Sequence, residues 1–286
     1  MGAVLALLAS VSWGSGDFLG GTLSRKAHPL AVLQASQGIA IVAILVVAIV
    51  SGDLGASGYL WWGILGGVVG VLALACFYTA LAQGTMGVVA PVAATGAVVP
   101  VGISLLQGEA PSVLQLLGIV VAVVGVVLAS GPERGTRADT KAGRRAARRP
   151  LLLAGIAALG FGGTLSIVAE GSHHSVIMTL LTMRIVNVLI SSTLILLVVR
   201  RPARPGRSDL GSLAVAGLTD AGANGLYALA TREALVSVSS VLASLYPAVT
   251  ALLAWRFHHE RLRPVQVAGV AATLAGVALI AVGSSS

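Results

Sequence analysis

The sequence predicts an all-α integral membrane protein with about ten transmembrane helices in two inverted five-helix repeats. Only 10% of the 286 residues are charged and 56% are hydrophobic, with a mean hydropathy of +0.95, whereas soluble domains carry about 25% charged residues. Apolar stretches of roughly 20 residues recur along the chain, which is the helix length that crosses a hydrocarbon core about 30 Å thick. The second half of the chain also repeats landmarks of the first half.

The apolar stretches place the membrane spans. In the first half we expect spans at 2–22, 29–51, 59–82, 86–107 and 112–130, and in the second half at 150–170, 175–199, 210–230, 236–256 and 264–283. An even number of crossings brings both termini to the same side of the membrane.

Basic residues test the number of spans, because Lys and Arg collect in short loops on the cytoplasmic side of a membrane. The odd-numbered loops hold Arg25 and Lys26, the run from 134 to 149 and the arginines after the seventh and ninth spans, whereas the even-numbered loops hold only Arg232. Ten spans in the plasma membrane therefore place both termini outside the cytoplasm. The net charge of +8 reflects this topology, and nucleic acid is not expected as a partner because the basic residues lack interleaved aromatic residues.

A basic segment divides the chain near its middle. We interpret residues 131–149 as a cytoplasmic linker between a first repeat at 1–130 and a second repeat at 150–286. In the alternative interpretation the linker also docks on anionic lipid headgroups, where each cation contributes about 1 kcal/mol.

The internal repeat is clearest at the end of each half. The segment GEAPSVLQLLGIVVAVVGVVLASG aligns with HERLRPVQVAGVAATLAGVALIAVG and superposes Glu109 on Glu260, Gln115 on Gln266, Gly118 on Gly269 and Gly125 on Gly276. Weaker echoes pair Trp13 and Gly14 with Phe161 and Gly162, Gln37 with Arg184, and Tyr78 with Tyr227. Because each half holds an odd number of spans, the second copy enters the bilayer inverted, as in many transporters. We expect Glu109 and Glu260 to cap the helices that follow them.

These features resemble the drug/metabolite transporter superfamily, in the group of ten-span proteins with two EamA domains. The resemblance rests on the repeated glutamates and the glycines after them, on Trp13 with Gly14, on Arg184, and on Pro100 and Pro247. It implies a plasma-membrane exporter or importer of small metabolites that uses a central cavity between the halves. The first half departs from the pattern by carrying Gln37 where the second half carries Arg184.

Three charged residues, Asp17, Arg184 and Asp220, fall well inside predicted spans, where a charge costs roughly 2.5–3.5 kcal/mol. We expect Arg184 and Asp220, at comparable depths on neighbouring helices, to form an ion pair that offsets part of this cost. The pair is structural, or it opens to bind a zwitterionic solute, or Asp220 takes up a proton during transport. Asp17 either lines the cavity or lies near lipid headgroups.

Polar and aromatic residues on the same helices outline a candidate substrate site. Helical spacing places Asn224 and Tyr227 near the face of Asp220, and Asn187 beside Arg184. The complete set of candidate substrate-binding residues is Trp13, Asp17, Gln34, Gln37, Tyr78, Arg184, Asn187, Asp220, Asn224 and Tyr227. The sequence therefore predicts a cavity lined mainly by the first, second, seventh and eighth spans.

The sequence favours a secondary transporter that moves a small metabolite or drug-like solute by alternating access, with the proton as a candidate coupling ion. No Walker-type loop and no GxSxG or HExxH motif occurs, so no cofactor is expected. We expect the His and Glu clusters at 170–174 and 258–260 to be interfacial caps and not metal sites. The alternatives are a passive channel, a non-transport membrane subunit or, less favoured, an intramembrane enzyme. The expected partners are a small-molecule substrate, the lipid bilayer and protons.

Overall fold

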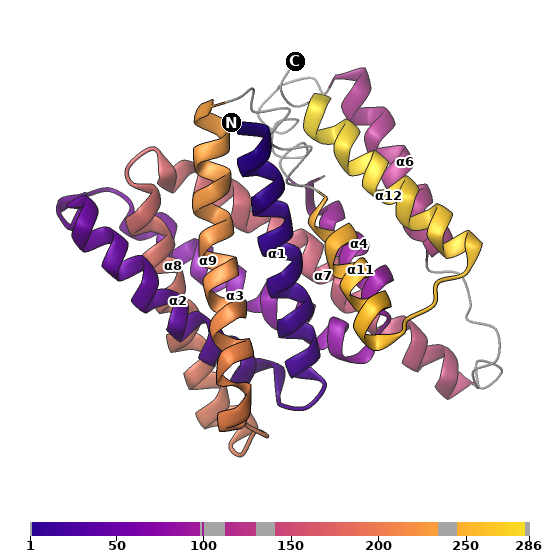
Figure 1. Ribbon diagram of the computed structural model, residues 1–286, viewed down its shortest axis with the longest axis horizontal. Helices are drawn as coiled ribbons and strands as arrows, with labels where there is room; N and C mark the ends of the chain where they lie inside the picture. Colours follow the sequence, from indigo (N-terminus) through magenta and orange to yellow (C-terminus); the bar gives the residue numbers. More distant parts are fainter. Residues whose placement is uncertain (1, 98, 100–111, 130–140, 234–244, 284–286) are drawn as a thin grey trace.

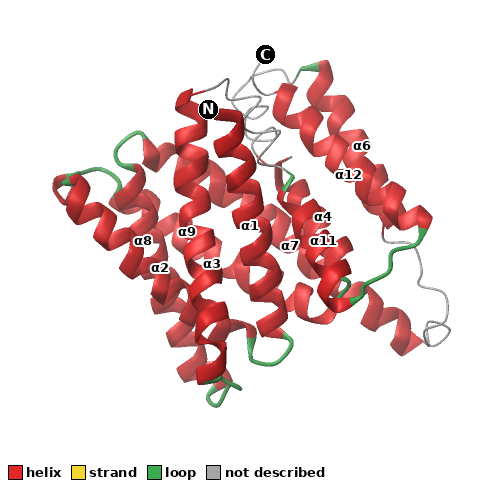
Figure 2. Ribbon diagram, in the orientation of Figure 1, coloured by secondary structure: helices red, strands yellow, loops and turns green. Residues whose placement is uncertain are grey.

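The computed structural model describes residues 2–97, 99, 112–129, 141–233 and 245–283, which form helices joined by short loops (Figure 2). The first half contributes α1 (Gly2–Ser24), α2 (Pro29–Ser51), α3 (Leu60–Gln83), α4 (Met86–Ala94) and α6 (Val113–Ala129). The second half contributes α7 (Lys141–Ser172), α8 (Val176–Leu194), α9 (Leu210–Glu233), α11 (Tyr246–His258) and α12 (Pro264–Gly283). The predicted all-α fold is confirmed.

The helices follow the predicted spans closely, with two differences. α7 begins at Lys141, so part of the predicted linker is helical, and α8 continues into a π-helical turn at Ile195–Val199. The spans predicted at 86–107 and 236–256 run partly outside the described residues, as do Pro100, Glu109 and the linker residues 131–140. Five helical segments of the described chain are long and apolar enough to cross a membrane, namely Val4–Ser24, Pro29–Ser51, Leu60–Gln83, Arg148–Val168 and Val176–Val199.

Local chemistry explains where several helices begin and end. Pro29 opens α2 in the first turn, where its missing N–H costs nothing, and Gly52 ends the helix with a φ of 78°, a conformation that glycine adopts without strain. The Ser175 hydroxyl accepts a hydrogen bond from the Met178 backbone N–H and caps α8. Pro247 lies in the first turn of α11. The second and seventh spans thus start at defined residues, which sets the depth of their polar side chains.

The helices pair according to the inverted repeat. α1 packs against α9 and α3 packs against α7, which are equivalent pairs when the halves are exchanged. The pairs α2 with α8, α4 with α11, and α6 with α12 each join a helix to its own repeat partner. α1 begins and α12 ends at the same end of the bundle (Figure 1). The fold is therefore a duplicated, inverted arrangement.

The crossing of α6 and α12 is made by the glycines that the repeat alignment superposes. A Cβ atom at Gly118 would lie 2.7 Å from the Gly276 carbonyl oxygen, and one at Gly125 would lie 2.7 Å from the Gly269 carbonyl oxygen. Because the two glycines of one helix meet those of the other in reversed order, the helices run antiparallel and are related by a two-fold axis. Small residues permit this close approach.

The glutamines of the repeat also match. The Gln115 side-chain oxygen accepts a hydrogen bond from the Ser112 backbone N–H at 2.8 Å, and Gln266 does the same for Arg263 at 3.0 Å. The expectation that Glu260 caps the helix after it is wrong. Its carboxylate instead accepts a hydrogen bond from the backbone N–H of Gly87, at the start of α4.

The glycine crossing predicts a stability difference between two matched variants. Gly125→Ala should lower the melting temperature, because its methyl group would lie 2.7 Å from the backbone oxygen of Gly269 and overpacking costs about 1–3 kcal/mol. Gly155→Ala on α7, where an added Cβ meets nothing within 4 Å, should preserve or raise it, because alanine stabilises a helix by about 1 kcal/mol over glycine. Thermal unfolding in detergent measures both, and equal melting temperatures would contradict the close crossing.

Candidate functional site

A cavity of about 190 Å³ lies inside the bundle, between helices of both halves. Its walls come from α1 and α3 of the first half and from α7, α8, α9 and α11 of the second. The lining residues are Trp13, Asp17, Gly70, Leu74, Phe161, Thr164, Met183, Arg184, Asn187, Asp220, Asn224 and Tyr246. The cavity thus combines an apolar and aromatic wall with a few polar groups, which is typical of small-molecule sites.

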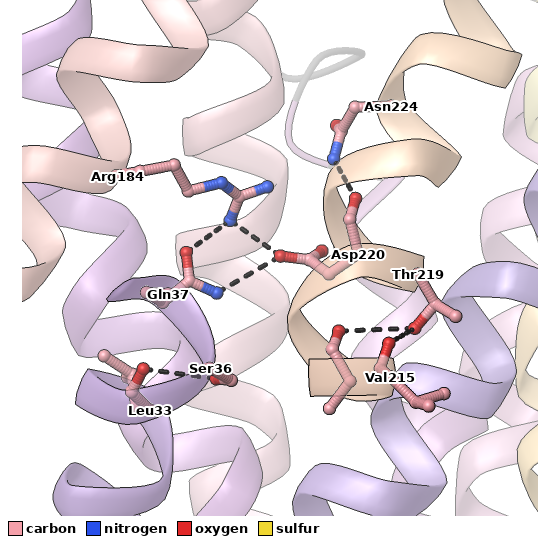
Figure 3. A network of polar contacts seen from close by, with 9 residues as sticks. Leu33, Ser36, Gln37, Arg184, Val215, Thr219, Asp220 and Asn224 are labelled. Carbon is pink, nitrogen blue, oxygen red and sulfur yellow. Dashed lines mark hydrogen bonds and ion pairs between the residues drawn. The ribbon is translucent and has the colours of Figure 1, made fainter. Parts of the chain in front are cut away.

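Arg184, Gln37 and Asp220 form a closed triangle of polar contacts at this cavity (Figure 3). Arg184 Nη1 donates to Gln37 Oε1 at 2.7 Å and lies 2.7 Å from Asp220 Oδ2. Gln37 Nε2 donates to the same Asp220 oxygen at 3.2 Å. We call these residues the Arg184 triangle. It connects α2, α8 and α9, and hydrogen bonds to charged groups are stronger than neutral ones.

Burial differs between the two charged members of the triangle. The Arg184 side chain is 5% exposed and the Asp220 side chain is 26% exposed. The Arg184 Nε atom is buried without a hydrogen-bond partner in the part of the chain that the structure describes. Arg184 therefore depends on Asp220 for charge compensation, whereas Asp220 is also reachable by water or solute in the cavity.

Two amides flank the triangle and are held by backbone groups. Asn224 Nδ2 donates to the Asp220 carbonyl oxygen at 2.7 Å. The Asn187 amide, oriented with its nitrogen as donor, reaches the carbonyl oxygens of Gly67 at 2.8 Å and Met183 at 3.2 Å. Asn187 thus ties α8 to α3, where Gly67 permits the approach, and Asn224 stabilises the turn that carries Asp220.

Aromatic residues form a second part of the site, which we call the aromatic wall. The Trp13 ring centroid lies 5.9 Å from that of Tyr227 and 6.3 Å from that of Tyr246. Phe161, from α7, packs edge-on against Phe77 at 5.3 Å. These rings come from α1, α3, α7, α9 and α11, so both halves contribute to the apolar part of the site.

Asp17 lies on α1, at the level of Asp220 on α9. A Cβ at the preceding residue, Gly16, would lie 3.8 Å from the Asp220 backbone nitrogen and 2.9 Å from the Thr219 hydroxyl, so the helices nearly touch at this depth. Asp17 is partly exposed and lines the cavity. Within the described ranges no side chain or backbone group hydrogen-bonds or ion-pairs with its carboxylate.

The candidate residues from the sequence separate into three groups. Six of them line the cavity, namely Trp13, Asp17, Arg184, Asn187, Asp220 and Asn224. Gln37 and Tyr227 contact residues that line the cavity but are not lining residues themselves. Gln34 and Tyr78 do not line the cavity, because Gln34 donates to the Ser192 hydroxyl and Tyr78 is buried against Gly20 on α1.

Sequence reasoning missed Phe161, Thr164 and Tyr246, which line the cavity from α7 and α11. The repeat held a signal for one of them, since Phe161 aligns with Trp13. Tyr246 lies directly before Pro247, at the start of α11. Neither Tyr246 nor Thr164 has a charged neighbour in sequence that would have singled it out.

A second polar cluster joins the halves at the end of the bundle where α1 stops. Arg25 Nη2 lies 2.7 Å from Glu260 Oε1, and the Glu260 side chain is only 13% exposed. Glu260 Oε2 accepts from the Gly87 backbone N–H at 3.3 Å. One turn before Arg25, the Thr22 hydroxyl lies 2.8 Å from His258 Nε2. We call these five residues the Arg25 cluster, and it connects α1, α4 and α11.

Comparison with known proteins agrees with this architecture. The model of the EamA-like transporter family matches residues 1–131 and 148–282. The chain belongs to the EamA-like transporter family. This EamA-like protein is therefore a multi-pass membrane transporter of small solutes and not an enzyme.

Similarity to individual proteins adds only the fold. A solved structure entitled "Crystal structure of protein" is 14% identical to this EamA-like protein, with a TM-score of 0.66 over 97% of this chain and 95% of that one. No curated protein matches the chain. The roles of the cavity residues must therefore be argued from their own geometry.

The unequal burial of the ion pair predicts unequal effects of breaking it. Asp220→Asn leaves Arg184, which is 5% exposed, without a counter-ion, and an unpaired buried charge costs about 3 kcal/mol. Arg184→Met leaves Asp220, which water can reach, so the loss should be smaller. Thermal unfolding in detergent compares the two, with Arg207→Met on the exposed 3₁₀ turn Arg207–Asp209 as an unchanged control. A larger loss of stability in Arg184→Met than in Asp220→Asn would show that Asp220 does not compensate the charge of Arg184.

Proposed function

We propose that this EamA-like protein is a secondary transporter that moves a small solute across the plasma membrane by alternating access. The observation that carries the proposal is the Arg184 triangle, which holds two opposite charges in a cavity between inverted halves. Charged side chains inside membrane spans are costly and mark solute or ion pathways. Transporters with inverted repeats bind their substrates near the bilayer midplane, where the halves meet.

A solute or a proton that reaches Asp220 would break the contacts of the Arg184 triangle. Asp220 is the more exposed of the two charged partners, so it is the member that a solute reaches first. Protonation of a carboxylate removes the charge that attracts the arginine. Binding at Asp220 would release α9 from α8 and α2, which links events in the cavity to helix movement.

The Arg25 cluster supports a state in which the cavity is closed toward the cytoplasm. Arg25 belongs to the first loop and Glu260 to the ninth, both odd-numbered loops that the distribution of basic residues assigns to the cytoplasm. The contact between them holds α1 against α11 at that end. In our proposal the Arg25 cluster is the cytoplasmic gate, and it opens when the cavity faces inward.

Solute flux in proteoliposomes under an imposed pH gradient tests the proposal with a panel of amino acids, amines and drugs. The wild type should show saturable flux that stops when the gradient is dissipated. Asp220→Asn and Arg184→Gln should reduce it tenfold or more, a loss of about 1.4 kcal/mol, because each removes one charge of the triangle.

Matched substitutions outside the cavity control for general damage. Asp53→Asn, in the loop after α2, and Arg207→Gln, before α9, change the same charges away from the site and should leave flux intact. Flux that does not saturate and ignores the gradient would favour a channel. Wild-type flux retained in both triangle variants would contradict the assigned site.

The gate predicts a change in accessibility at Thr22. With Cys76 replaced by alanine, Thr22→Cys should react slowly with a membrane-impermeant maleimide, and adding Glu260→Gln should speed the reaction because the Arg25–Glu260 contact is lost. Lys26→Cys, at an exposed position, is the control and should react quickly in both backgrounds. Reaction of Lys26→Cys only from the extracellular side would overturn the predicted orientation. Equal reaction rates of Thr22→Cys with and without Glu260→Gln would overturn the gate.

A further inference from the structure

The charges that line the cavity do not cancel. The ionisable lining residues are Asp17, Arg184 and Asp220, together with the phenol of Tyr246, which is uncharged at neutral pH. Arg184 is compensated by Asp220 at 2.7 Å, whereas the Asp17 carboxylate has no partner among the described residues. With all three groups ionised the cavity carries one uncompensated negative charge. Inside a membrane such a charge calls for a counter-ion.

We propose that the solute of this site is a monovalent organic cation with one aromatic or apolar ring, whose ammonium group pairs with Asp17. The inference rests on the proposed transport function and names its substrate class. Binding brings the charge of the cavity to zero, and Asp220 stays available to a proton. Asp17 is partly exposed to the cavity, so an ammonium group can reach it.

The aromatic wall suits such a solute. Trp13 precedes Asp17 by four residues on α1, so both side chains lie on the same helical face. Tyr246 stands beside Trp13 with 6.3 Å between ring centroids. Aromatic faces attract organic cations, and tryptophan does so most strongly. A cation held by Asp17 therefore lies within a cation-attracting wall.

The volume of the cavity is sufficient for a solute with one ring. A cavity of about 150 Å³ accepts benzene, and this cavity measures about 190 Å³. The difference leaves room for a short arm that carries the ammonium group.

The geometry disfavours zwitterionic and anionic solutes. A substrate carboxylate would need a free cationic donor, and Arg184 is 5% exposed with its Nη1 atom shared between Gln37 and Asp220. Its Nε atom is buried, and the charge of its guanidinium group is already compensated by Asp220. A carboxylate would also enter a site that is already negative. Amino acids should therefore bind more weakly than the corresponding amines.

A matched series of solutes tests the charge preference. Phenethylamine, phenethyl alcohol, phenylalanine and hydrocinnamate share one ring and differ in charge. Calorimetric titration of the detergent-purified full chain at neutral pH should show the tightest binding for phenethylamine, by about tenfold or more over the others, as expected for a hydrogen bond to a charged group. Tighter binding of phenylalanine or hydrocinnamate would overturn the proposal.

Variants at Asp17 test the named partner. Asp17→Asn should weaken phenethylamine binding about tenfold or more and leave phenethyl alcohol unchanged, whereas Asp17→Glu should retain part of the amine affinity. Because the substitution to asparagine removes an uncompensated charge, the melting temperature should stay the same or rise, so loss of binding would not reflect misfolding. Unchanged amine affinity in Asp17→Asn would overturn the assignment.

Counterflow in proteoliposomes separates this inference from the proposed function. Exchange of phenethylamine that is lost in Asp17→Asn would support both. Exchange of phenylalanine or hydrocinnamate without exchange of phenethylamine would overturn the substrate class and leave the transport function standing. Absence of exchange for every solute, with the protein folded, would count against both.

Discussion

The ion pair between Arg184 and Asp220 is the interaction on which the arrangement of the cavity depends. Hydrocarbon offers no water to solvate a guanidinium group, so α8 can carry Arg184 only where neighbouring helices supply a carboxylate and an amide oxygen. Asp220 comes from the same half and Gln37 from the other half. The need to satisfy one arginine thus determines how three helices face one another and leaves a polar cavity between the repeats.

Glycine makes this arrangement sterically possible. A Cβ at Gly67 would lie 3.0 Å from the Met183 carbonyl oxygen, directly before Arg184, and one at Gly63 would lie 3.1 Å from that of Thr179. α3 therefore packs almost backbone to backbone against α8 and presents the carbonyl group of Gly67 to Asn187. Larger residues at these positions would move α8 away and separate Arg184 from its partners. Polar contacts and small residues act together, since neither alone would hold the charge at this depth.

Much of the fold could be predicted from the sequence, because a membrane imposes length and composition on each helix. Most helix bounds lie within a few residues of the predicted spans, and the repeat indicated the inversion. The pairing of Arg184 with Asp220 also followed from depth and charge. Contacts that depend on the rotation of a helix about its axis could not be predicted from the sequence. Gln37 looked like a departure from the repeat, yet it bonds both charged residues, and Glu260 bonds α4 instead of capping α12.

The hydrogen bond between Arg184 and Gln37 joins two positions that the repeat makes equivalent, so it lies near the axis that relates the halves. In an alternating cycle, points near that axis keep their depth while the helix ends tilt past them. The guanidinium group would then travel little along the direction of the electric field. The membrane voltage would do its work on the solute and on any proton that enters the cavity, while Arg184 remains a stationary charge about which the two halves rock.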